Sequence, residues 1–369
     1  MKILPFQAMY PDLDLIASEE SFFNSVKEQY NEYEESGFFK KTAEEAVFIY
    51  QIKTNKRYHI GIVSCLDIED YNKGRILKHE KTLASKEQSM MNLMLQRKAN
   101  VKPVLLTYTP VKEINNWIKN NAVKANKFYT VRFSELKEVH TYWKIADGNK
   151  IQKIKKIFEK KLPYVYIADG HHRCSTSALL HTRKKGKVKL LDFSKLLCVF
   201  FSTDELEIHD YNRIIELEND QSYLIIMAEL TKYFHINVMR RGAKPKIKHE
   251  IVMHMDGKWF SLRWKDSVLH AHKDADVLLD TELLNRYVLK PILGIKDVRS
   301  DTRVRYVSGK LGVKGILNKT TKFERSVSFM IYPVEFDELQ EVADKKLTLP
   351  PKSTWFEPRI KNGMLIQKY

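Results

Sequence analysis

Residues 164–173 read Tyr-Val-Tyr-Ile-Ala-Asp-Gly-His-His-Arg, and Cys-Ser-Thr-Ser-Ala-Leu-Leu follows at residues 174–180. The apolar, β-branched run predicts a strand over Tyr164–Ala168 that stops at Asp169-Gly170, and the small residues predict a helix that begins just past Arg173. Two histidines and an arginine therefore lie at a strand-to-helix junction. Unpaired backbone N–H groups and the positive end of the helix dipole meet there, which favours binding of a phosphate.

Length and composition bound the class of protein. The chain has 369 residues, 43% apolar and 30% charged, which is ordinary for a soluble globular protein. This length predicts two parts, 1–205 carrying the junction and 206–369 packing on it. No apolar run reaches the ~20 residues of a membrane helix, and no secretory signal is visible. Cys65, Cys174 and Cys198 are too widely spaced for a disulfide framework. We therefore expect a cytoplasmic protein without a membrane partner, and the sequence leaves its oligomeric state open.

The net charge is +17, and its distribution is uneven. Residues 144–195 contain 14 Lys or Arg against 4 Asp or Glu, so +10 of the total lies around the junction. Solvated lysine-rich helix faces are one interpretation, and an electrostatic funnel toward a phosphate-bearing ligand is the other. Nucleic acid is a disfavoured partner, because no helix-turn-helix, zinc finger or aromatic-rich RNA motif accompanies the charge.

Hydrophobic periodicity along the chain predicts strands and helices that mix without strict βαβ alternation. This pattern is typical of an α+β (mixed α/β) fold. A methionine stripe on the helix predicted over 85–99 indicates core packing. The other main predicted elements are a helix over 19–36, hairpins over 47–66 and 250–264, strands over 103–108, 196–201 and 326–334, and helices over 222–233, 281–293 and 336–344.

Known phosphate-binding loops are excluded. The run from Gly312 to Thr320 superficially suggests a Walker A loop, but Asn318 stands where the glycine before the lysine is required. No GxGxxG motif follows a predicted strand, which removes a dinucleotide site. The glycine-rich loop, HRD and DFG motifs of protein kinases are also missing.

Each residue of the junction suits phosphate chemistry. Arg173 can bind two phosphate oxygens at once, and Gly170 lets the backbone approach a ligand closely. His171 and His172 can donate to phosphate oxygens, and His172 can move a proton near neutral pH. Asp169 can hold Mg²⁺ or orient a histidine. Zinc is less favoured, since adjacent histidines do not easily ligate one ion. The alternative is a polar turn with a surface histidine pair.

A second charged segment, Lys-His-Glu-Lys-Thr at residues 78–82, precedes the methionine helix. Glu80 is flanked by His79 and two lysines, one of them Lys81. Such a carboxylate is either a general base held ionised or part of a charged loop, and the residues alone do not choose between the two.

The chain resembles, over nearly its whole length, the domain-of-unknown-function family 1015. The similar stretches are Pro5-Phe6, His79-Glu-Lys-Thr-Leu83, Arg97-Lys-Ala-Asn-Val-Lys-Pro103, Tyr142-Trp-Lys-Ile145, Tyr166-Ile-Ala-Asp-Gly-His-His-Arg173, Gly294-Ile-Lys-Asp-Val-Arg-Ser-Asp301 and Pro350-Pro-Lys-Ser-Thr-Trp-Phe356. Cys174 departs from the family, in which an aromatic residue commonly follows the arginine.

The Asp-Gly-His-His-Arg junction is also similar to that of the ParB/sulfiredoxin superfamily, some members of which are free L-serine kinases. This resemblance implies a ParB/sulfiredoxin-like core around the junction, elaborated by further hairpins and helices. It implies that Gly170, His171, His172 and Arg173 bind nucleotide phosphates. An upstream glutamate activates the substrate hydroxyl in those kinases, and Glu80 is the positional match.

The function these observations predict is a small-molecule kinase that moves a phosphoryl group from ATP or ADP, with Mg²⁺, to a hydroxylated metabolite such as free L-serine. Glu80, Asp169 and His172 are the predicted catalytic residues, and Lys81 and Thr82 join the residues that bind the phosphates. A loop containing Lys352, Ser353 and Thr354 is predicted to close the site, and His79 is a further candidate site residue. The alternatives are a nucleotide-binding regulatory or DNA-associated ParB-like protein without turnover, and a phosphatase acting on a phosphometabolite.

Overall fold

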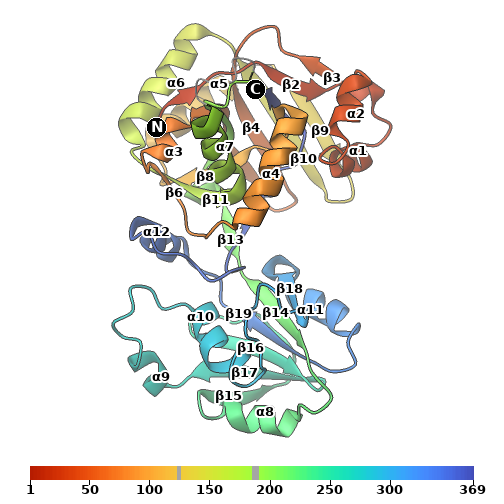
Figure 1. The fold of residues 1–369 in the computed structure, drawn as a ribbon, viewed down its shortest axis with the longest axis vertical. Helices are drawn as coiled ribbons and strands as arrows, with labels where there is room; N and C mark the ends of the chain where they lie inside the picture. Colours follow the sequence, from red (N-terminus) through yellow and green to blue (C-terminus); the bar gives the residue numbers. More distant parts are fainter. Residues whose placement is uncertain (123–125, 185–190) are drawn as a thin grey trace. The chain divides into compact units, whose positions relative to one another are not determined.

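The computed structural model describes residues 1–122, 126–184 and 191–369, and shows a mixed α+β protein (Figure 1). It contains two compact units, one of residues 1–207 with 358–369 and one of residues 208–357. The C-terminal segment 358–369 thus belongs to the first unit and not to the second part in which the sequence analysis places it. The reason is strand β21 (Ile366–Lys368), which pairs with two strands of the first unit.

The first unit is built on a nine-stranded mixed sheet. Strand β11 runs parallel to β6 and antiparallel to β8, and β12 runs parallel to β8. The strand order is β6 (Ile76–Leu77), β11 (Val165–Asp169), β8 (Val104–Tyr108), β12 (Lys195–Ser202), β5 (Tyr58–Asp67), β4 (Val47–Lys53), β10 (Glu138–Ile145) and β9 (Tyr129–Phe133), with β1 (Ile3–Leu4) paired to β5. The hairpin predicted over 47–66 is confirmed by the register of β4 with β5, in which Lys53 pairs with Tyr58.

Helices of the first unit cover the sheet with apolar faces. Ile114 and Trp117 of α5, Ile154 and Phe158 of α6, and Cys174 of α7 join the sheet in one buried cluster. The helix predicted over 19–36 is instead two helices. The helical elements are η1 (Leu13–Leu15), α1 (Glu19–Ser25), α2 (Tyr30–Glu35), α3 (Glu69–Asn72), α4 (Ala84–Arg97), α5 (Lys112–Ala122), α6 (Gly148–Lys161), α7 (His171–Lys184) and η2 (Thr203–Glu205).

A small four-stranded sheet brings the C-terminal strand into the first unit. Its order is β3 (Phe39–Lys41), β2 (Ala8–Pro11), β21 and β7 (Ala99–Asn100). Strand β7 directly follows α4, and Asn100 in it donates to Gln367 Oε1 of β21 at 2.8 Å. This pairing fixes the residues just before β21 near the end of α4.

The second unit contains a six-stranded antiparallel sheet. The hairpin predicted over 250–264 is confirmed, and the run from Gly312 to Thr320 forms a helix. The sheet order is β15 (Phe234–Met239), β17 (Lys258–Trp264), β16 (Glu250–Met255), β19 (Ser326–Ile331), β14 (Tyr211–Glu216) and β18 (Val304–Ser308), and β13 (Glu207–His209) pairs with β20 (Trp355–Glu357). The helical elements are α8 (Tyr223–Leu230), α9 (Asp266–His270), α10 (Asp280–Leu284), the π-helix η3 (Asn285–Leu289), η4 (Gly309–Leu311), α11 (Gly312–Thr320) and α12 (Phe336–Asp344).

Among the residues that the structure describes, no helix has the length and apolar character needed to cross a membrane.

Candidate functional site

The strand-to-helix junction lies between β11 and α7, and we call residues 169–173 the corner. Strand β11 ends at Asp169, with a register shift against β8 between Ile167 and Asp169. Gly170 turns the chain with a φ of +109°, and α7 begins at His171. The helix thus begins before Arg173 and not after it as predicted, because the glycine completes the turn in one residue. His171, His172 and Arg173 lie in the first helical turn.

The Arg173 guanidinium lies across Gly170. A Cβ added to Gly170 would come within 2.6 Å of Arg173 Nη2, so both the positive φ and the close approach require glycine. Arg173 Nη2 donates to Asp169 Oδ2 at 2.9 Å, while Arg173 Nε is buried without a hydrogen-bond partner in the described part of the chain. The guanidinium is thus held at the helix N-terminus with an unused donor.

Asp169 is shared by cations from three parts of the chain. Its Oδ2 also lies 3.2 Å from Lys102 Nζ, and its Oδ1 lies 4.0 Å from Arg359 Nη1. Burial alone would raise the pKa of Asp169, but Arg173, Lys102 and Arg359 together hold it well below its usual range. Burial and the neighbouring Arg173 lower the pKa of Lys102, against the opposing effect of Asp169. Three cations from the described part of the chain therefore approach one carboxylate, which favours an anionic ligand.

Lys102 and Arg359 are site residues that were not predicted from the sequence. Lys102 lies in the stretch 97–103 that carries the family resemblance, and Arg359 closely follows the similar stretch 350–356. The family resemblance of those stretches could have pointed to the two residues, but no local pattern indicates that they lie near Asp169.

The contacts of Asp169 bear on the magnesium site predicted there. Both carboxylate oxygens of Asp169 face cations, with which an Mg²⁺ ion would compete, and magnesium binding at Asp169 stays a prediction. Asp169 positions the cations around it.

Segment 79–83 lies against the corner because of strand pairing. Strand β6 runs parallel to β11, with Ile76 opposite Val165, so the chain leaves both strands at the same edge of the sheet. The His79 backbone N–H donates to His171 Nε2 at 3.5 Å, and the Leu83 backbone N–H donates to His172 Nε2 at 3.2 Å. The two adjacent histidines therefore hold the two ends of this segment.

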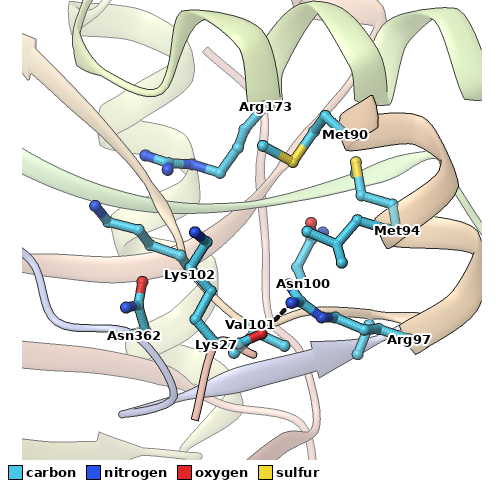
Figure 2. Close-up of a pocket in the computed structure, with 11 residues that line it drawn as sticks. Lys27, Met90, Met94, Arg97, Asn100, Val101, Lys102, Arg173 and Asn362 are labelled. Atoms are coloured by element: carbon cyan, nitrogen blue, oxygen red, sulfur yellow. Dashed lines mark hydrogen bonds between the residues drawn. The ribbon is translucent and has the colours of Figure 1, made fainter. Parts of the chain in front are cut away.

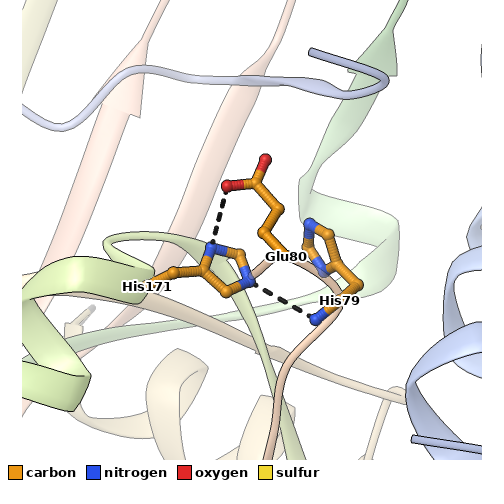
Figure 3. A group of neighbouring side chains, drawn as sticks. All are labelled: His79, Glu80 and His171. Carbon is orange, nitrogen blue, oxygen red and sulfur yellow. Dashed lines mark hydrogen bonds and ion pairs between the residues drawn. The ribbon is translucent and has the colours of Figure 1, made fainter. Parts of the chain in front are cut away.

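Glu80 follows His79 in this segment, and its side chain lies beside the His171 ring (Figure 3). Its Oε2 is 3.6 Å from His171 Nδ1, and its side chain is 37% exposed. The predicted association of Glu80 with the corner thus has a structural basis. Burial lowers the pKa of His79 to about 3. Burial and His79 keep the pKa of His171 well below its usual value. Both imidazoles are therefore neutral at physiological pH.

His79, Glu80 and His171 also form a group whose potential metal-ligating atoms lie within 4.8 Å of one another, the only such group in the described ranges. The two imidazole rings pack nearly at right angles, with centroids 4.5 Å apart. The histidine that joins His171 is therefore His79, from the preceding segment, and not the adjacent His172 considered from the sequence.

Lys81 and Thr82 point to different surroundings. Lys81 is exposed, whereas Thr82 is half-buried. A hydrogen bond from Thr82 lowers the pKa of Glu87 in the first turn of α4, and Ser175 of α7 acts in the same direction. Thr82 therefore interacts with Glu87, a residue that the sequence analysis did not single out.

A small pocket, with a cavity volume of about 50 Å³, adjoins the corner (Figure 2). One wall is apolar and includes Met90 and Met94 of α4, so the methionine stripe lines a pocket as well as packing in the core. Arg173 and Lys102 border the pocket on the corner side, and its other cations are Lys27 and Arg97. None of the described residues that line it is acidic.

The basic segment 144–195 is in part a solvated helix face. Lys153, Lys156 and Lys160 of α6 are exposed, on the side opposite the buried Ile154. Residues 185–190, which carry three further lysines of this segment, lie outside the described residues.

The loop containing Lys352, Ser353 and Thr354 belongs to the second unit. Lys352 Nζ lies 5.1 Å from the centre of the Tyr211 ring, and Ser353 Oγ donates to the Pro350 carbonyl at 2.7 Å. Closure of the site by this loop stays a prediction.

Solved structures with a remote likeness to this chain include the following three. A free serine kinase variant in complex with ADP shares 10% identity, over 80% of this chain and 87% of that chain, with a TM-score of 0.39. SbnI with a C-terminal truncation, from Staphylococcus aureus, shares 10% identity over 81% of this chain and 85% of that chain, with a TM-score of 0.44. A conserved hypothetical protein from Pyrococcus furiosus shares 12% identity over 83% of this chain and 95% of that chain, with a TM-score of 0.40. Scores this low establish neither fold nor activity.

No curated protein matches the chain significantly. The model of the family described as "Protein of unknown function (DUF1015)" matches residues 9–283, which is most of the chain. The chain therefore belongs to the DUF1015 family.

Proposed function

We propose that this protein is a small-molecule kinase that transfers a phosphoryl group from ATP or ADP to the hydroxyl group of a small metabolite. Free L-serine is the acceptor to test first, because the corner resembles that of free L-serine kinases. The proposal covers the first unit, which contains every residue that we place in the reaction.

The observation that carries the proposal is the excess of cations at the N-terminus of α7. Arg173, Lys102 and Arg359 converge on the single carboxylate of Asp169. Phosphoryl transfer depends on positioning and on neutralising negative charge, and a helix N-terminus with fixed cations supplies both. A terminal phosphate at Gly170 would receive the buried Nε–H donor of Arg173.

Glu80 is the proposed base. As the acceptor oxygen attacks the terminal phosphorus, Glu80 takes the hydroxyl proton, and the bond from that phosphorus to the bridging oxygen breaks. The products are a phosphomonoester and the nucleotide shortened by one phosphate. A positioned base of this kind contributes about 10²- to 10⁴-fold to the rate. His172, predicted as a proton carrier, instead accepts from the Leu83 backbone N–H, so we place it in holding segment 79–83.

The lining of the pocket beside the corner is suited to the base of the donor. Its apolar wall of Met90 and Met94 offers polarisable thioethers to a flat base, and its cations offer charge to the phosphates. The same lining would disfavour a cationic ligand. We therefore assign the nucleoside to this pocket and the terminal phosphate to the corner.

The test is to incubate the protein with ATP or ADP, Mg²⁺ and a set of hydroxylated metabolites, and to follow phosphorus by NMR. A new phosphomonoester that forms with one acceptor supports the kinase. Release of inorganic phosphate from a phosphometabolite without nucleotide would favour a phosphatase. Nucleotide binding without turnover would favour a regulatory protein. Either of these last two outcomes contradicts the proposal.

Two variants separate binding from chemistry. Arg173→Ala should abolish nucleotide binding, because it removes the central cation and the buried donor. Glu80→Gln should keep nucleotide binding and lose about 10²- to 10⁴-fold in turnover. Full activity in Glu80→Gln would remove Glu80 from the mechanism.

A further inference from the structure

His171 has little room to act on a ligand. It is 5% exposed, and each ring nitrogen faces a protein group. Nε2 accepts from the His79 backbone N–H at 3.5 Å, and Nδ1 lies 3.6 Å from Glu80 Oε2. The role in phosphate binding predicted for this residue therefore lacks a free nitrogen.

The two contacts decide which nitrogen of His171 carries the proton. A neutral imidazole has one N–H donor and one acceptor nitrogen. Since Nε2 faces the N–H of His79, Nε2 supplies the lone pair and Nδ1 carries the hydrogen. That hydrogen points toward the Glu80 carboxylate (Figure 3). The His79 backbone thus sets the tautomer, and the tautomer determines what His171 offers to Glu80.

We propose that His171 is a positioning residue, which holds the Glu80 carboxylate at the corner through its Nδ1–H. The proposal rests on the proposed function, since it gives a role to the orientation of the base. The buried His79 ring supports the arrangement by packing against the His171 ring at 80°. The pair therefore acts as a rigid support behind a half-exposed carboxylate.

A metal ion bound by His79, Glu80 and His171 is the competing interpretation. Coordination through His171 Nδ1 would leave the hydrogen on Nε2, directed at the N–H of His79. Two donors would then face each other at the buried end of the ring. The observed contacts therefore favour the hydrogen-bonded arrangement, and metal binding becomes an outcome of the test.

The first measurement does not depend on activity. Long-range ¹H–¹⁵N correlation NMR of the wild-type histidine side chains reports which nitrogen of each ring is protonated, and the His171→Asn variant assigns the His171 signals by their loss. We expect the Nδ1–H form at neutral pH. The Nε2–H form would overturn the proposal. So would stoichiometric binding of Co²⁺ with a ligand-field spectrum that His79→Ala removes.

The second measurement uses two amide replacements. Asn places its side-chain N–H near the position of Nδ1, whereas Gln reaches the position of Nε2. His171→Asn should therefore keep turnover within about threefold of wild type, and His171→Gln should lose about 10- to 100-fold in kcat, as expected for one hydrogen bond to a charged group. KM for the nucleotide should stay unchanged in both. Equal losses in the two variants would contradict a donor role for Nδ1.

A matched control lies on the same helix. His181 Nε2 is 2.9 Å from Glu69 Oε1, which is also a histidine–glutamate pair, and no role in the site is assigned to it. His181→Asn should leave turnover unchanged. If the wild-type protein has no turnover with any donor and acceptor, the proposed function fails, while the NMR measurement still decides whether His171 donates to Glu80.

Discussion

Replacing Asp169 by Asn should change stability and anion affinity in opposite directions. The carboxylate is the shared counter-ion of Arg173 and Lys102, at 2.9 and 3.2 Å, with Arg359 more distant at 4.0 Å. The substitution keeps the size of the side chain and removes its charge. The three cations then lose the negative charge of Asp169 in the folded state, which makes their positive charge more available to a phosphate.

The magnitudes follow from those contacts. A hydrogen bond to a charged group contributes about 1.5–3 kcal/mol, and partial exposure of the groups reduces this through solvent screening. The Asp169 side chain is 31% exposed, so we expect the free energy of unfolding of the first unit to fall by about 1–2 kcal/mol. Loss of one negative charge beside a bound phosphate should tighten binding about fivefold to tenfold at low salt.

The effect on stability should depend on pH. The pKa of Asp169 is lowered in the folded protein, so its contribution is present above the ordinary aspartate pKa of about 3.9 and is lost as the pH falls below it. The difference in unfolding free energy between wild type and Asp169→Asn should therefore be full at about pH 7 and shrink on acidification.

The assay has two parts. Urea denaturation, monitored by amide hydrogen exchange in β11 and α7, measures the free energy of unfolding, and calorimetric titration with pyrophosphate measures the anion affinity. Asp67→Asn is the control, because Asp67 pairs with Lys2 at 2.7 Å in the same unit but is not part of the corner. It should lower stability without changing anion affinity. A parallel loss of stability and anion affinity in Asp169→Asn would refute the assignment of these cations to an anion site.

Two further substitutions test other features. Gly170→Ala should lower stability by about 1–2 kcal/mol because of the positive φ at this position, and it should weaken pyrophosphate binding about tenfold because the added Cβ displaces Arg173. The control is Gly74→Ala, which has a φ of +71° and no atom near its Cβ, so it should lower stability without changing pyrophosphate binding. Equal pyrophosphate affinity in both variants would contradict this. Burial raises the pKa of Asp210 to about 6, so its favourable contribution is lost as the pH rises through that value. Asp210→Asn should therefore raise the melting temperature of the second unit at about pH 7 and have little effect at about pH 4, as calorimetry can check; a lower melting temperature at neutral pH would refute it.

Local patterns predicted the elements of the fold well where they are strongly periodic. The hairpins β4–β5 and β16–β17 form as expected, because alternating side chains and turn residues are short-range signals. The helix predicted over 19–36 divides into α1 and α2, and the helix predicted over 281–293 is only α10 followed by a π-helix. Tertiary packing decides such boundaries, which local propensity describes poorly.

The candidate site was predictable in its centre and not in its surroundings. The corner follows from an apolar strand that ends in Asp-Gly before a helix, and all of that information lies within ten neighbouring residues. Glu80 reaches the corner through the parallel pairing of β6 with β11, which the two-residue strand β6 does not reveal by itself. Lys102 and Arg359 come from distant parts of the chain, and so does the pocket wall.

The sequence by itself determined that a glycine turn would bring Arg173 to the junction of a strand and a helix, because backbone conformation and the helix dipole act locally. Only the tertiary structure decided the electrostatics around that turn. Sheet pairing brings Lys102 and Arg359 to Asp169 and seats Glu80 beside His171. Ion pairs depend on distance in space, and distance in space between remote residues is fixed by strand order and register.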